Sequence, residues 1–299
     1  MSVDNPPSLE EFLAAPPETV ARVAPATAVY APGGTRRSAT LAGVPLTDDS
    51  YIQWVRPQLI ENIALFFRLG VQHLIIPSIG PRNFQEGGVY GRRLVSWLAD
   101  VVAGPAMLAD YKTHGWQGRM LGVPALPLLA EAAARVQQAT AGFGPHTIWW
   151  YLVADNEDPW REVLAMARQT GAQTRAEAIR ALYGADIPPA DLYIGFGKPF
   201  IGTTMVPPLL TGESLHGYWT QRPGMQLTER VLRAILYDYA YSRRTWEADH
   251  SARYLQAHKY AGLWDTDYVL GIGSKRDGYW YPNAFTIPTL PDDPTVGGA

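Results

Sequence analysis

Residues 71–77, VQHLIIP, form a nearly continuous apolar run of strand length. Strands of this kind are typical of parallel sheets, because helices cover both faces of such a sheet. Apolar residues at helical spacing precede the run over residues 51–69, and Gly70 supplies a stop signal. Before this helix, residues 26–30 are predicted as a short strand. The segment therefore predicts two strands of one parallel sheet, joined by a helix.

The same alternation continues along the chain. Helices are predicted over residues 90–102, 128–139, 160–170, 175–182, 227–244 and 250–260, and strands over residues 120–123, 147–153, 191–195 and 268–272. This order predicts an α/β fold with a central, mostly parallel sheet surrounded by helices. Residues 197–224 are rich in Gly, Pro and Thr and are predicted as a long functional loop.

A chain of 299 residues is compatible with one large α/β domain. We expect an N-terminal lead-in over residues 1–25, a single catalytic domain over residues 26–287 and a disordered tail over residues 288–299.

Composition excludes several classes of function. Hydrophobic residues make up 47% of the chain and charged residues 18%, which predicts a globular protein. The net charge is −3 without a basic run, so a nucleic-acid partner is not expected. The absence of cysteine excludes disulfides, thiolate zinc sites and cysteine nucleophiles. Since neither a signal-like segment nor a long apolar run is present, we expect no membrane span and a cytoplasmic location.

The turn Gly33-Gly34-Thr35-Arg36-Arg37 directly follows the first predicted strand. Glycines let backbone N–H groups converge on an anion, Thr35 adds a hydroxyl donor, and guanidinium groups bind phosphate oxygens in pairs. The pattern favours diphosphate binding, with an ordinary turn followed by solvated arginines as the alternative. Dinucleotide binding is disfavoured, because GxGxxG is absent and no clear helix directly follows the turn.

Two further regions carry candidate phosphate-binding cations. Lys198 closes a GFGK turn after the strand predicted at 191–195, and ligands gather at the carboxyl ends of parallel strands. Arg243 and Arg244 end the predicted helix 227–244, whose late tyrosines include Tyr239. For Lys198 the alternative is a plain strand-to-loop turn. For the helix residues the alternatives are core packing of the tyrosines and the usual preference of helix C-termini for cations.

Acidic and histidine residues give no clear metal motif. The six histidines lack metal-ligand spacing, and HExxH, GxSxG and Walker sequences are absent. Asp48-Asp49 and residues 155–158 are the compact acidic clusters, and neither forms DDxxD. Solvated loop acids are the default interpretation of both clusters.

Four blocks occur in a characteristic order: GGTRR at 33–37, DLYIGFG at 191–197, LRAILYDYAYSRR at 232–244 and GIGSKRDGYWY at 271–281. Together they resemble the cis-prenyltransferase superfamily, most closely its terpene-forming branch. The resemblance runs from about residue 29 to residue 281. It implies a fold like that of undecaprenyl diphosphate synthase, an elongated apolar tunnel and a homodimer.

The resemblance also implies roles for particular residues. Diphosphate is expected at the first turn, with further cations nearby, and the set is Gly33, Gly34, Thr35, Arg36, Arg37, Lys198, Arg243 and Arg244. Tyr51 and Tyr90 fall where terpene-forming relatives have pocket tyrosines, and Arg36, Tyr51 and Tyr90 are the candidate catalytic residues. The candidate pocket walls are Phe66, Phe67, Trp97 and Tyr239.

One departure from the family pattern concerns Mg²⁺. The family loop normally begins with an aspartate linked to magnesium and to diphosphate departure, and this position is Gly33. A second acid expected near Tyr90 corresponds to Gly88. Either Asp48 or Asp49 substitutes, or backbone amides and arginines stabilise the leaving group, or catalysis of the family kind is lost.

The leading functional hypothesis is ionisation of an allylic C20 diphosphate, linear or bicyclic. Water, proton loss or a bound nucleophile would then quench the carbocation. A class II terpene cyclase is the expected upstream partner for a bicyclic substrate. Two alternatives stay open: cis chain elongation, disfavoured because GFGKPFIG at 195–202 lacks an RTGGExR-like arginine pattern, and a catalytically silent partner or lipid-binding subunit.

Overall fold

The computed structural model describes residues 6–46, 49–86, 88–243, 259, 262, 270–276 and 279–282. The chain divides into two compact units, Met1–Arg244 and Thr245–Ala299. In the second unit, β7 (Gly273–Arg276) and β8 (Tyr279–Pro282) form an antiparallel hairpin. The predicted tail and most of the helix predicted at 250–260 lie outside the described residues. The strand predicted at 268–272 is wrong where it is described, because residues 270–272 form a turn and its exit before β7 begins at Gly273. The single domain over residues 26–287 stays a prediction.

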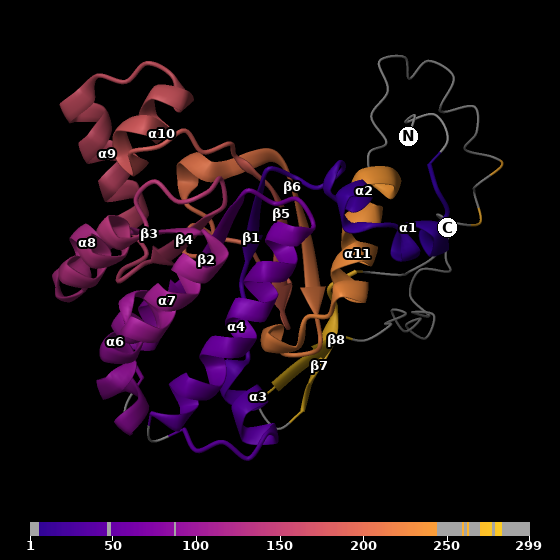
Figure 1. Cartoon of the computed structure of the whole chain (residues 1–299), viewed down its shortest axis with the longest axis horizontal. Coiled ribbons are helices and arrows are strands. Elements are labelled where there is room, and N and C mark those ends of the chain that lie inside the picture. The colour runs from indigo at the N-terminus through magenta and orange to yellow at the C-terminus, as the bar shows by residue number, and fades with distance from the viewer. Residues whose placement is uncertain are drawn as a thin grey trace, which may run out of the picture. The chain divides into compact units, whose positions relative to one another are not determined.

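The first unit is built on a six-stranded sheet in which every paired strand is parallel (Figure 1). Its strands lie in the order β3-β4-β2-β1-β5-β6. Their bounds are β1 (Thr27–Tyr30), β2 (His73–Ile79), β3 (Gln117–Leu121), β4 (Thr147–Leu152), β5 (Ala190–Phe196) and β6 (Thr211–Thr220). The predicted α/β class with a central parallel sheet is confirmed.

Helices cover both faces of this sheet. Their bounds are α1 (Leu9–Ala14), α2 (Pro17–Ala21), α3 (Thr35–Leu41), α4 (Ser50–Arg68), α5 (Pro81–Phe84), α6 (Gly88–Ala103), α7 (Pro105–His114), α8 (Ala130–Ala139), α9 (Asp158–Thr170), α10 (Arg175–Tyr183) and α11 (Glu229–Tyr237). Side chains alternate along β1, so Ala28 and Tyr30 pack in the larger core with α4, α6, α7, α8 and α11, whereas Val29 packs in the smaller core with α10.

The sheet has a topological switch point at β1. The chain runs from β1 to β2 on one side, and later crosses to β5 on the other side. Tyr30 pairs with Ile194 of β5, and Ile194 pairs with Tyr218 of β6, so the three carboxyl ends lie at one edge. Ligands of open parallel sheets bind at such an edge, beside the switch point.

The lead-in predicted over residues 1–25 contains two helices that are packed into the first unit. Phe12 of α1 is buried, and its ring lies 5.6 Å from that of Tyr237. Arg233 of α11 is also buried and donates to the carbonyl oxygens of Ala15 at 2.6 Å and Phe12 at 3.4 Å. These contacts explain why α1 folds against α11.

The long loop predicted over residues 197–224 is wrong in its second half. Residues 211–220 form β6, a strand at one edge of the sheet. Glycine content disfavoured a strand, but Gly217 is required by packing, because a Cβ there would lie 2.4 Å from the Trp219 ring. Among the described residues, no helix is long and apolar enough to cross a membrane.

Candidate active site

The Gly-Gly turn at the carboxyl end of β1 depends on close packing against β5. Gly34 has a φ of 77°, a conformation that favours glycine, and it is the N-cap of α3. A Cβ on Gly34 would lie 2.7 Å from Cε1 of Phe196, the last residue of β5, and one on Gly33 would lie 3.2 Å from Cδ1. The backbone N–H of Gly224 also donates to the Gly33 carbonyl at 2.9 Å.

A helix begins directly after this turn, contrary to the sequence prediction. Thr35, Arg36 and Arg37 form the first turn of α3. The first N–H groups of an α-helix have no carbonyl partner within the helix, and the helix dipole favours negative charge there. The structure therefore combines backbone polarity with the hydroxyl and guanidinium donors of the motif.

Arg36 is held by a carboxylate that the sequence analysis did not single out. Its Nη1 and Nη2 atoms donate to Oε2 and Oε1 of Glu86 at 2.5 and 2.8 Å. Glu86 lies between α5 and α6, 50 residues along the chain, where no motif marks it. This pair connects α3 to the segment before α6.

Arg37 is held in a different way. Its guanidinium carbon lies 5.0 Å from the centroid of the Phe196 ring, in a cation–π arrangement. Phe196 belongs to the DLYIGFG block, but its role was not predicted. One aromatic ring thus contacts the turn glycines and orients an arginine.

A hydroxyl pair links the turn to two aromatic rings. Thr35 Oγ1 and the Tyr51 hydroxyl are 2.7 Å apart. Tyr51 is buried near the start of α4, and its ring centroid lies 5.7 Å from that of Trp97 on α6. The Trp97 indole N–H donates to Asp49 Oδ1 at 3.0 Å, which connects α6 to the start of α4. The structure therefore brings Thr35, Tyr51 and Trp97 together.

The carboxylates described near the turn fit poorly as ligands of a protein-held Mg²⁺. Asp49 also accepts from Arg93 at 3.3 Å, Glu86 is paired with Arg36, and position 33 carries no side chain. Asp48 lies outside the described residues. No group of three or more His, Asp or Glu suited to a metal occurs in the described part of the chain.

Phe66 and Phe67 are both buried in the core near the end of α4. The Phe66 ring lies 5.0 Å from that of Tyr30, whose hydroxyl donates to the Gly224 carbonyl at 2.5 Å. Burial raises the pKa of Tyr30 above its usual value, so this hydroxyl stays a neutral donor. Phe67 contacts the rings of Trp116 and His146. The role of Phe66 and Phe67 as pocket walls stays a prediction.

The remaining candidates lie on other elements. Lys198 is exposed, two residues beyond the end of β5. Arg243 donates to Asp238 Oδ2 at 2.6 Å and lies over the Tyr218 ring at 4.0 Å. Tyr239 is buried beside the ring of His216. These contacts join Arg243 to β6 and to its own helix.

Arg244 lies outside the described residues, and Tyr90 lies in α6 with its side chain outside them. The roles predicted for these two residues stay predictions.

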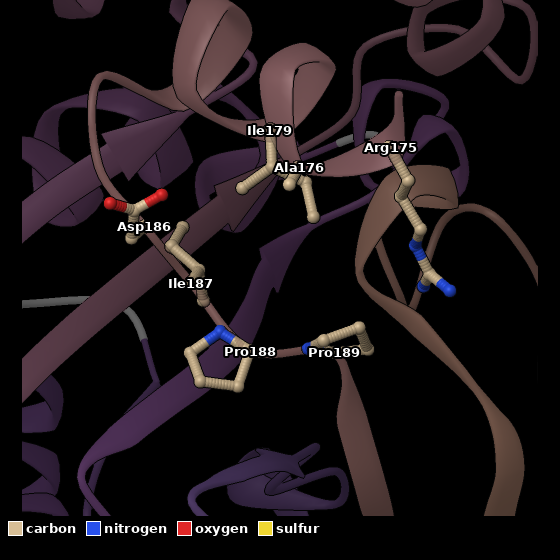
Figure 2. A pocket seen from close by; sticks show the side chains of 7 residues that line it. All are labelled: Arg175, Ala176, Ile179, Asp186, Ile187, Pro188 and Pro189. Carbon is tan, nitrogen blue, oxygen red and sulfur yellow. The ribbon is translucent and has the colours of Figure 1, made fainter. Parts of the chain in front are cut away.

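A cavity of about 380 Å³ lies at the opposite end of the sheet from the turn. Figure 2 shows its lining residues, which are Arg175, Ala176, Ile179, Asp186, Ile187, Pro188 and Pro189. Pro188 and Pro189 immediately precede β5, whereas the turn follows the carboxyl end of β1. This cavity is therefore separate from the turn, and the tunnel implied by the family resemblance stays a prediction.

Solved structures share the fold. Lavandulyl diphosphate synthase from Lavandula x intermedia, in complex with dimethylallyl diphosphate, superposes with a TM-score of 0.58 at 17% identity, over 73% of this chain and 96% of that one. A probable undecaprenyl diphosphate synthase from Campylobacter jejuni gives a TM-score of 0.52 at 14% identity, over 74% and 97%. The fold is that of a cis-prenyltransferase.

Curated relatives narrow this class. (+)-Kolavelool synthase from Herpetosiphon aurantiacus is 42% identical over 282 residues, which cover 94% of this chain and 97% of the relative. Tuberculosinyl adenosine transferase from Mycobacterium tuberculosis is 29% identical over 92% of this chain and 98% of the relative. No protein-family model matches the sequence. The chain belongs to the cis-prenyltransferase superfamily, in the terpene-forming branch that these two relatives represent. By this kinship the chain is an enzyme.

Proposed function

We propose that the enzyme ionises an allylic C20 diphosphate whose leaving group binds at Gly33–Arg37. The contact of 2.7 Å between Thr35 Oγ1 and the Tyr51 hydroxyl carries the proposal. It joins the donors suited to a diphosphate directly to a buried aromatic pair, Tyr51 and Trp97. Ionisation needs both environments side by side, since it creates an anion and a cation together.

The proposed step breaks the bond between the allylic carbon and the diphosphate oxygen, and both electrons leave with the oxygen. Donors already oriented toward the developing charge lower the barrier of such a step. Thr35, Arg36 and Arg37 supply these donors, together with the first backbone N–H groups of α3.

The allylic cation would be stabilised by the aromatic rings, where one favourable cation–π contact contributes about 0.5–2 kcal/mol. The close packing of the Tyr51 ring on α4 against the Trp97 ring on α6 supports this role. Tyr90 is proposed as a third aromatic residue on the resemblance alone. The cation then reacts with water to give an alcohol, loses a proton to give an olefin, or reacts with a bound nucleophile to give an adduct.

We further propose that leaving-group stabilisation rests on amides and arginines rather than on a Mg²⁺ held by a loop carboxylate. Gly33 and the neighbouring Phe196 ring support this proposal, because the ring leaves little room for a side chain at position 33. Ion pairing already engages Glu86, and Asp49 bonds Trp97 and Arg93. We expect EDTA to slow the reaction by less than about tenfold.

The test is incubation of the purified chain with geranylgeranyl diphosphate and with bicyclic C20 diphosphates, in Mg²⁺ and in EDTA. Mass spectrometry of the organic products should detect a terpene alcohol, olefin or adduct. The absence of product from every allylic substrate would contradict the proposal. Addition of isopentenyl diphosphate should give no longer chain, and chain growth would instead favour cis elongation.

The assembly and cellular context belong to the same proposal. We propose a homodimer in the cytoplasm, acting downstream of a class II terpene cyclase when the substrate is bicyclic. Sedimentation velocity tests the dimer, and a mass of about one chain at micromolar concentration would contradict it.

A further inference from the structure

Glu86 is an acidic side chain in a site suited to an anion, and the proposed ionisation gives it no task. It lies against Arg36, one of the two arginines of the turn, with both carboxylate oxygens bonded to the guanidinium. The Glu86 side chain is 28% exposed and the Arg36 side chain is 46% exposed, so solvent and a ligand can reach the pair. A carboxylate at this place reduces the positive charge that a diphosphate would meet.

The geometry of the pair is the one that phosphate oxygens adopt on arginine. A guanidinium binds carboxylate and phosphate oxygens alike through two parallel N–H···O bonds. Glu86 therefore uses the Nη1 and Nη2 donors that a diphosphate would use in the same bidentate mode. An exposed ion pair stabilises a protein only weakly, and a diphosphate brings more charge than one carboxylate.

We propose that Glu86 is a displaceable competitor for Arg36. It orients the guanidinium in the free enzyme, gives way when substrate diphosphate binds, and recaptures Arg36 when product diphosphate leaves. Glu86 is thus a positioning residue that sets diphosphate affinity and release. The inference rests on the proposed function, since it requires diphosphate at Arg36.

The neighbouring arginine contacts an aromatic ring. Arg37 lies over the Phe196 ring, and a cation–π contact uses the face of the guanidinium rather than the N–H donors at its edge. The turn therefore has one arginine oriented by an aromatic ring and one oriented by a carboxylate. The carboxylate opposes a bidentate anion, because it occupies the Nη1 and Nη2 donors of Arg36.

The test is calorimetric titration of inorganic pyrophosphate into the full chain and into Glu86→Gln, Arg36→Ala and the double variant. Glu86→Gln should tighten pyrophosphate binding about three- to fivefold, since it removes the competing charge. Arg36→Ala should weaken binding at least about tenfold. The effect of Glu86→Gln should disappear in the Arg36→Ala background, because this variant lacks the guanidinium for which Glu86 and pyrophosphate compete.

Two controls separate this effect from general changes of charge and folding. Glu131→Gln removes the same charge from an exposed pair with Arg135 inside α8 and should leave pyrophosphate affinity unchanged. Glu86→Ala should also tighten pyrophosphate binding, as Glu86→Gln does. Circular dichroism checks that each variant is folded. In turnover, Glu86→Gln should lower KM and strengthen inhibition by pyrophosphate.

The outcomes distinguish the inference from the proposed function. Unchanged or weaker binding by folded Glu86→Gln, with Arg36→Ala weakened, would overturn the competitor role and leave the diphosphate site standing. Equal tightening in the Arg36→Ala background would overturn it as well. If the unaltered chain binds no pyrophosphate, or Arg36→Ala binds it normally, the proposed function itself fails.

Discussion

At the scale of single residues, the packing of Phe196 depends on the absence of a side chain at Gly34. The left-handed backbone of Gly34 turns the chain from β1 into α3, and the missing side chain makes room for the Phe196 ring. The same ring lies against Arg37. The shape of the turn and the direction of an arginine therefore depend on one contact between β1 and β5.

Gly34→Ala tests this dependence. A positive φ costs a non-glycine residue about 1 kcal/mol, and the clash with Phe196 adds to it. We expect the free energy of unfolding in urea to fall by about 2–3 kcal/mol and pyrophosphate binding to weaken. Gly43→Ala is the matched control, since Gly43 has a φ of 71° with nothing within 4 Å of the added Cβ. Equal destabilisation by the two substitutions would contradict the packing argument.

At the scale of secondary-structure elements, the sequence predicted the periodic segments best. The helix predicted over residues 51–69 corresponds to α4 (Ser50–Arg68), because ten of its positions are buried at helical spacing. α3 was missed, since TRRSATL is short and lacks an apolar stripe. The α-helix predicted over residues 227–244 ends at Tyr237, and a π-helix follows over Asp238–Ser242.

Two histidines at the amino ends of β2 and β4 make stability depend on pH. Burial lowers the pKa of His73, with His146 adding to the effect, and burial also lowers the pKa of His146. Their unfolded forms bind protons more readily, so stability is fully present above pH 6.5 and falls as the pH drops below it.

We therefore expect the free energy of unfolding to be lower at pH 5.5 than at pH 7.5, by about 1 kcal/mol at most because both groups are partly solvated. Urea denaturation at the two pH values measures this difference. His73→Gln should reduce this difference, because it removes one of the two partly buried imidazoles. Greater stability at pH 5.5 would refute the assignment.

The N-terminal helices show how an element outside the predicted domain contributes to the core. Phe12→Ala should lower the free energy of unfolding by about 3–5 kcal/mol, because it leaves a cavity against Tyr237 and Tyr241. Phe200→Ala is the control, since Phe200 is 52% exposed, and should cost far less. Similar losses in urea denaturation would argue against a packed α1.

At the scale of the whole molecule, the site could be predicted in part. The GGTRR turn was found because glycine, threonine and arginine carry a local chemical signal. Glu86 and Phe196 were missed because their contacts with the arginines bridge about 50 and 160 residues of sequence, respectively. Such contacts depend on the register of β1 with β5 and on the path from β2 to α6, which one sequence does not specify.

In the proposed mechanism, diphosphate departs at the turn after β1, with Arg36 as a main donor. The most direct measurement is the initial rate of pyrophosphate release from geranylgeranyl diphosphate by the unaltered enzyme, by Arg36→Ala and by the control Arg135→Ala on exposed α8. Arg36→Ala should release pyrophosphate at least about a hundredfold more slowly, whereas Arg135→Ala should keep the full rate. A folded Arg36→Ala variant with the full rate would contradict this mechanism.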